Sequence, residues 1–106
     1  MSARRPAVRL TSEASRDYED ILLSTMRAWG VEQKATYRAA LTGALRRLRQ
    51  HPGLGQPQDD LFPGCRSVQV EQHVIYYHQP RATEIIVVRI LHRRQDASVA
   101  VREPRL

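Results

Sequence analysis

One strand end gathers side chains that could do chemistry. The run Ile85–Leu91 is almost unbroken aliphatic and stops abruptly at a cluster of histidine and arginine. Histidine moves protons near neutral pH and arginines stabilise phosphate charge, so these residue types could cleave RNA. The same cluster could instead dock a protein or pair with Asp96. We therefore take four residues as the candidate functional surface: Arg89, His92, Arg93 and Arg94.

Other chemistries lack the residue patterns that they need. His73 and His78 are five apart, which places them on opposite faces of a strand and argues against a shared metal ion. Gly53 and Gly55 follow a helix, whereas a phosphate-binding loop follows a strand and opens a helix. Cys65 is the only cysteine, so no internal disulfide forms. We predict no metal, no cofactor and no catalytic nucleophile.

Two amphipathic helices precede this strand. Thr11 is placed to cap the first helix, and Gly30 to end it in a left-handed conformation. The second helix ends at His51 and Pro52, because proline disfavours helix at the residue before it. The first apolar face comprises Tyr18, Ile21, Leu22, Thr25 and Trp29. The second comprises Tyr37, Leu41, Ala44, Leu45 and Leu48. The short link predicts an antiparallel helical hairpin.

Short apolar runs predict the strands. They cover Ala7–Leu10, Arg66–Val70, His73–Tyr77 and Ile85–Leu91. The last strand is apolar on both faces and is expected to lie centrally in the sheet. We expect a turn over Gln79–Thr83, which contains Pro80, and a loop over Pro52–Gly64 held to the core by Leu54, Leu61 and Phe62. The order β-αα-βββ predicts an α+β fold, in which the helical hairpin packs on a small, mostly antiparallel sheet.

Length and composition limit the classes of function. The 106 residues are expected to form one domain, with flexible ends at 1–6 and 97–106. A net charge of +6, almost all from arginine, favours a nucleic acid, a nucleoprotein complex or an acidic protein as partner. No apolar run is long enough for a membrane span. The lone Cys65 fits a reducing cytoplasm.

Five segments carry a resemblance to a known family. They read RLTSEASRDYEDI, AWGVEQKATYRAAL, HPGLGQPQDDLFPGCRS, QHVIYYH and VVRILHRRQD, and they extend over about residues 8–96. In this order and spacing they resemble the ParE branch of the ParE/RelE toxin superfamily. The resemblance implies a cytoplasmic toxin that inhibits DNA gyrase without being an enzyme. It also implies a hetero-oligomer with a cognate antitoxin, a small DNA-binding protein with an amphipathic tail.

Departures from the related RelE pattern help to choose the branch. RelE-type relatives cut messenger RNA on the ribosome and typically carry an arginine where this chain has Val74. They also usually have an aromatic residue near the C-terminus, whereas none follows Tyr77 here. Both absences disfavour a ribosome-dependent endonuclease, although His92 and the neighbouring arginines keep that alternative open. An inactive binding module is a further alternative that stays open. Against the ParE pattern, Glu71 occupies a position often held by glycine and His51 one often held by asparagine.

Overall fold

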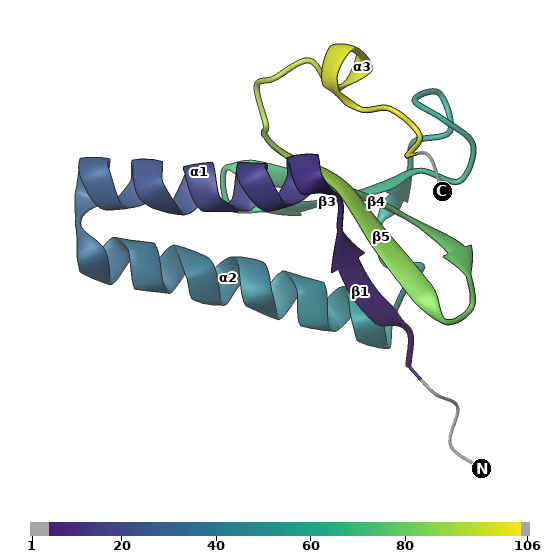
Figure 1. Ribbon diagram of the computed structural model, residues 1–106, viewed down its shortest axis with the longest axis horizontal. Coiled ribbons are helices and arrows are strands. Elements are labelled where there is room, and N and C mark those ends of the chain that lie inside the picture. Colours follow the sequence, from purple (N-terminus) through teal and green to yellow (C-terminus); the bar gives the residue numbers. More distant parts are fainter. Residues whose placement is uncertain (1–4, 105–106) are drawn as a thin grey trace.

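The computed structural model describes residues 5–104, and shows two long antiparallel helices packed on a five-stranded sheet (Figure 1). Its strand order is β1-β5-β4-β3-β2. The α+β architecture predicted from the sequence is confirmed. The elements are β1 (Ala7–Leu10), α1 (Ser12–Trp29), α2 (Val31–Gln50), β2 (Gln56–Pro57), β3 (Arg66–Val70), β4 (His73–Arg81), β5 (Glu84–His92) and α3 (Ala97–Ala100).

Local capping fixes both ends of the helical hairpin. The Thr11 hydroxyl accepts a hydrogen bond from the Ala14 N–H at 3.0 Å, as expected of an N-cap. Gly30 alone links α1 to α2, with φ 96° and ψ 176°. The positive φ agrees with the prediction, but this ψ lies outside the left-handed helical region and in one that is essentially restricted to glycine. α2 ends at Gln50, before His51 and Pro52, as predicted.

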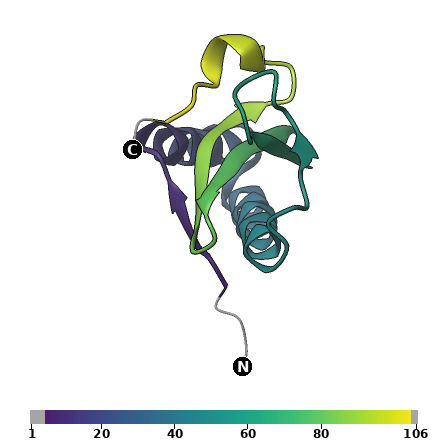
Figure 2. The same cartoon turned by 90° about the vertical axis from the view of Figure 1, so that its right-hand side faces the viewer.

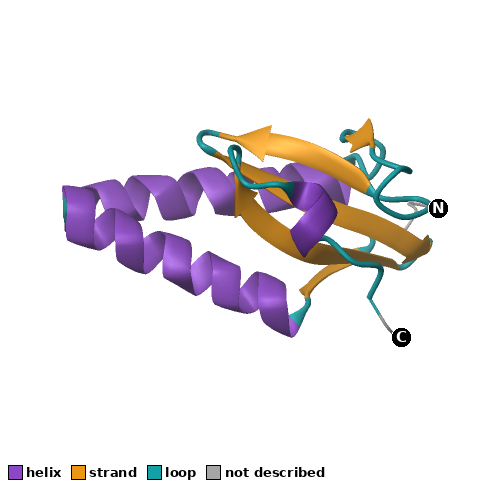
Figure 3. Ribbon diagram, turned by 90° about the horizontal axis from the view of Figure 1, so that it is seen from above, coloured by secondary structure: helices purple, strands orange, loops and turns teal. Residues whose placement is uncertain are grey.

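The main core lies between this hairpin and the sheet. The stripe predicted for α2 is confirmed, because four of its members are buried and Leu45 is half-buried. Trp29, predicted to share the buried face of α1, is instead 76% exposed. Trp29 is the last residue of α1, at the tip of the helical hairpin, and this tip projects beyond the end of the sheet (Figures 1 and 3). The buried members of the core are Ala14, Ile21, Leu22, Tyr37, Leu41, Ala44, Leu48, Val70, Ile75, Tyr77, Ile85, Val87 and Ile90.

β5 lies inside the sheet, as its two apolar faces predicted. It pairs with β1 in parallel and with β4 in antiparallel orientation. Tyr76 lies opposite Arg89 and Tyr77 opposite Val87, so Val88 is an extra residue that forms a β-bulge. As a consequence Val87 and Ile90, three residues apart, both face the helices.

The sequence placed the β4–β5 turn too early. β4 continues through Pro80 to Arg81, so the expected turn over Gln79–Thr83 is wrong and the turn is only Ala82–Thr83. The ladder is irregular between His78 and Arg81. Proline, which has no N–H to donate, is tolerated at such irregular positions of a strand.

A second, smaller core covers the other face of the sheet. It contains Phe62, Cys65, Val88, Leu91 and Val101. The segment from Asp96 to Pro104 forms α3 and crosses this face, on the side away from α2 (Figure 2). Of the flexible end expected at 97–106, residues 97–104 thus pack on the sheet with Val101 buried, and residues 105–106 lie outside the described part of the chain. In the 52–64 loop, Phe62 and Leu61 pack as expected, but Leu54 is 48% exposed and does not anchor the loop.

The loop also contains the two-residue strand β2, which the sequence did not predict and which pairs with the start of β3. No helix among residues 5–104 is long and apolar enough to cross a lipid bilayer. The flexible end expected at 1–6 includes residues 1–4, which lie outside the described part of the chain.

Candidate functional site

Three aromatic rings from three elements meet at the end of β5. His92 closes β5 and lies directly opposite His73 of β4 in the ladder, with ring centroids 5.4 Å apart and edge to face. Tyr37 of α2 lies edge to face with His73, also at 5.4 Å. Of these rings the sequence singled out only His92 for function, because residues far apart along the chain give no signal of their contact.

The hydrogen bonds around the two imidazoles indicate which ring nitrogen carries the hydrogen in the neutral form. The Gln72 N–H donates to the Tyr37 hydroxyl at 3.2 Å, and this hydroxyl contacts Nδ1 of His73. Its other acceptor, the Val70 carbonyl, lies 3.5 Å away, which is long for an O–H···O hydrogen bond, so we assign the hydroxyl hydrogen to Nδ1 of His73. The backbone N–H of Arg94 donates to Nδ1 of His92 at 3.2 Å. Since Nδ1 is the acceptor in each ring, the single proton of each neutral imidazole lies on Nε2.

Burial favours the uncharged forms of Tyr37 and His73. Desolvation, with a further contribution from His92, lowers the pKa of His73 below its usual 6.5. Burial likewise raises the pKa of Tyr37, the hydrogen bond from Gln72 acts against this shift, and the charge of Glu71 adds to it. At neutral pH the Tyr37 phenol and the His73 imidazole of the cluster are therefore both neutral.

The cluster opens into a pocket of about 440 Å³. The pocket lies between the outer half of the helical hairpin and the β3–β4 turn. Glu71 lies in that two-residue turn with φ 54°, a region that favours glycine, so the turn forms in spite of the residue type. The pocket is lined by Thr25, Trp29, Gln33, Thr36, Tyr37, Ala40, Glu71, Gln72, His73 and His92.

Arg93 and Arg94 extend from the turn that follows β5. The Arg93 N–H donates to the Gln72 carbonyl at 2.8 Å, which ties this turn to the β3–β4 turn. Within residues 5–104 neither guanidinium has a hydrogen bond or an ion pair, and both residues are exposed. The strand ends at His92, so Arg94 does not continue along its face.

Arg89 is positioned differently from the other three candidates. Its Nε and Nη2 donate to the Asp17 carboxylate at 2.7 and 3.0 Å, and its Nη1 donates to the Ala100 carbonyl at 3.3 Å. The same carboxylate accepts the Ile90 N–H at 3.0 Å. Arg89 therefore joins α1, β5 and the C-terminal segment. The sequence did not predict this ion pair.

A second histidine site lies in the smaller core. His78 packs edge to face on Phe62 at 5.3 Å, and its buried Nε2 has no hydrogen-bond partner in the described chain. Burial lowers its pKa, whereas Glu103 and Glu84 act in the opposite direction. Burial also raises the pKa of Cys65 to about 11, which leaves an unreactive thiol inside this core.

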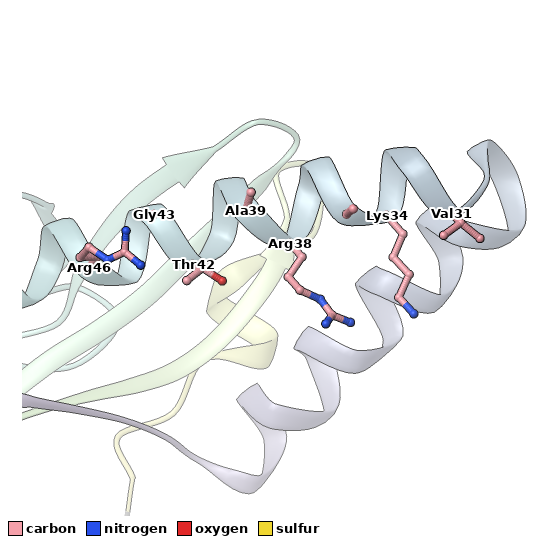
Figure 4. A pocket seen from close by; sticks show the side chains of 8 residues that line it. Val31, Lys34, Arg38, Ala39, Thr42, Gly43 and Arg46 are labelled. Carbon is pink, nitrogen blue, oxygen red and sulfur yellow. The ribbon is translucent and has the colours of Figure 1, made fainter.

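A further hollow of about 500 Å³ follows the exposed side of α2. Small residues form its floor, and Lys34, Arg38 and Arg46 are spaced along it (Figure 4). None of its lining residues is acidic. We call it the α2 groove, and it is lined by Val31, Lys34, Ala35, Arg38, Ala39, Thr42, Gly43 and Arg46.

Comparisons with known proteins agree over most of the chain. The family model described as ParE toxin of type II toxin-antitoxin system, parDE, matches residues 8–97. Toxin ParE1 of Caulobacter vibrioides is 37% identical over 89 residues, which are 84% of this chain and 91% of the relative. Toxin ParE1 of Mycobacterium tuberculosis is 33% identical over 87 residues, 82% of this chain and 89% of the relative.

Two solved structures share the fold. A chain of the chromosomal ParDE toxin–antitoxin system from P. aeruginosa superposes with a TM-score of 0.71 at 18% identity, over 85% of this chain and 98% of that one. A chain of the RelBE2 toxin–antitoxin complex from Mycobacterium tuberculosis gives 0.61 at 23% identity, over 85% and 100% of the two chains. At these identities the two structures support the fold and not a residue-level site.

Proposed function

The chain belongs to the ParE toxin family of type II toxin–antitoxin systems, and on this premise we propose that it inhibits DNA gyrase by binding and not by catalysis. The observation that carries this proposal is the cationic end of β5. Arg93 and Arg94 are exposed in the turn that directly follows His92, and their guanidinium groups have no partner within residues 5–104. Such groups are suited to an anionic surface of a protein–DNA complex.

The geometry also disfavours the endonuclease alternative. Val74, at the position where RelE-type relatives carry arginine, is aliphatic and half-buried on β4, so it cannot stabilise charge on a reacting phosphate. His73 is held neutral by its contact with Tyr37 and by burial, and its Nδ1 is already engaged. These features support a surface for binding more than a site that moves protons.

A gyrase assay tests the proposal directly. Purified protein is added to supercoiling and DNA-cleavage reactions, with and without ATP. We expect loss of supercoiling or accumulation of linear DNA. The variant H92A/R93A/R94A should fold normally and lose this effect. R16A/R27A, which removes two arginines from exposed positions of α1, is the control for net charge and should retain it.

Two results would contradict the proposal. If the folded protein has no effect on gyrase but messenger RNA is cleaved within minutes of its induction, the endonuclease alternative replaces it. If R16A/R27A loses as much inhibition as the triple variant, net charge and not the end of β5 is responsible. Since gyrase acts in the cytoplasm, the proposal also places the toxin there.

We further propose that a cognate antitoxin neutralises this toxin in a hetero-oligomer. Both structural neighbours come from toxin–antitoxin systems, which supports a partner of this kind. The α2 groove suits the amphipathic tail of such a protein, because its small residues allow a helix to approach and its basic residues attract acidic ones. A39W, which fills the groove at an exposed position, should remain toxic and fail to co-purify with antitoxin. Co-purification at the wild-type level would place the tail elsewhere.

A further inference from the structure

We infer that the pocket holding His73 and His92 is a binding site for a carboxylate side chain of a protein partner. This inference concerns a subsite that the proposed function does not require, and it does not depend on which protein is the target. It is based on the hydrogen-bond donors that the pocket offers, on the charges around it and on the chemistry of its walls.

The two imidazoles present a pair of free donors. In the tautomers assigned above, Nδ1 accepts from the Tyr37 hydroxyl in His73 and from the Arg94 N–H in His92, so Nε2 of each neutral ring carries a hydrogen. Neither Nε2 has a partner among residues 5–104, and neither is a fully enclosed polar atom of the kind found at His78. Both N–H groups are therefore accessible, on rings 5.4 Å apart. Two adjacent donors match the two oxygens of one carboxylate.

The surrounding charge favours an anion. The chain carries a net charge of +6, and the free guanidinium groups of Arg93 and Arg94 follow His92 directly. The ionisable groups that line the pocket from α2, the β3–β4 turn and the strands are Tyr37, Glu71, His73 and His92, and α1 contributes none. Of these only Glu71 is negative at neutral pH, and it lies exposed on the turn. Glu71 thus opposes an anion from the rim but does not occupy the donor pair.

The walls distinguish a carboxylate from other ligands. A cation would find no free acceptor on either imidazole, because both Nδ1 atoms are engaged. Phosphate is usually held by arginine or lysine, and neither residue lines this pocket. Trp29 and Ala40 add an apolar wall suited to the methylene groups of a glutamate or aspartate side chain. The combination favours an acidic peptide over a nucleic acid backbone.

Trp29 allows a direct test, because it is the only tryptophan of the chain and lines the pocket. The probe is the peptide acetyl-Gly-Glu-Gly-amide, added to the full chain at constant ionic strength with EDTA present to remove metal ions. Trp29 fluorescence and the nitrogen signals of His73 and His92 in NMR spectra report binding. Matched probes are the glutamine and lysine versions of the peptide and inorganic phosphate.

We expect the glutamate peptide to saturate the signal with a Kd on the order of millimolar, at least about tenfold tighter than the glutamine peptide. H92F should weaken binding about tenfold, while E71Q, on the exposed turn, should tighten it several-fold without disturbing the fold. E71Q is the decisive variant, because H92F also removes the acceptor for the Arg94 N–H.

Three results would overturn the inference. Equal responses to the glutamate and glutamine peptides would show that the carboxylate is not recognised. Tighter binding of phosphate than of the glutamate peptide would indicate a nucleic acid subsite instead. The pocket would recognise a cation if E71Q bound the glutamate peptide more weakly than the wild type does, or if the wild type bound the lysine peptide more tightly than the glutamate peptide.

Discussion

The ion pair between Asp17 and Arg89 should be a main determinant of stability. The Asp17 carboxylate accepts three hydrogen bonds, two from Arg89 and one from the Ile90 N–H. Both residues lie on β5 beyond Val87, where the pairing of β5 with β1 ends. In D17A the guanidinium and the strand N–H both lose their partner. Breaking a buried pair costs about 3–5 kcal/mol. Since these side chains remain 24% and 15% exposed, we expect about 2–3 kcal/mol here.

Urea unfolding of D17A measures this loss, and thermal unfolding should show a fall in Tm of about 10–20 °C. R9A is the matched control, because Arg9 forms an ion pair with Glu84 of similar length, 2.7 Å, but its side chain is 70% exposed. We expect R9A to cost under about 1 kcal/mol. The reasoning is refuted if D17A loses less than about 1 kcal/mol, or if R9A loses as much as D17A.

A substitution of Arg89 itself decides what this residue does. The sequence predicts Arg89 as part of the surface that binds the target, whereas its contacts assign it a structural role as well. R89A should be assayed against gyrase at a temperature well below its Tm, where the protein is folded. Retained inhibition would leave the functional surface to His92, Arg93 and Arg94, and loss of inhibition by folded R89A would return Arg89 to it.

Two further predictions concern pH and the β3–β4 turn. The pKa values of His73 and His78 are lowered in the folded protein, so the unfolded chain binds more protons below about pH 6.5 and the free energy of unfolding should fall as pH drops through that value. Urea titrations between pH 7.5 and 5 measure how steeply the free energy of unfolding changes with pH. H78F should make this change less steep, and an unchanged pH dependence would contradict the contribution of His78. E71G should raise the free energy of unfolding by about 1 kcal/mol, because glycine adopts the positive φ at position 71 without strain. If E71G instead unfolds at a lower temperature than the wild type, the Glu71 side chain itself stabilises the turn.

The spacing of apolar residues predicted an element correctly where one face of that element meets the core along its whole length. The stripe of α2 is such a case, and its end at His51 follows from proline chemistry. The same reasoning failed for Trp29, because helical spacing does not show where the supporting sheet ends. It failed for Pro80 because an irregular ladder tolerates a missing N–H. Asp17 was missed because its partner lies 72 residues away.

The site depends on one local feature that no sequence period could reveal. Ile85 and Val87 face the helices, so strict alternation would also turn Leu91 toward them and His92 away. The bulge at Val88 reverses the alternation, and His92 consequently lies beside His73 and Tyr37 on the helix side. Because β5 is apolar on both faces, its sequence has no alternation from which this reversal could be recognised. The sequence therefore identified His92 as a candidate but could not place it in the pocket, since its neighbours are determined by the bulge.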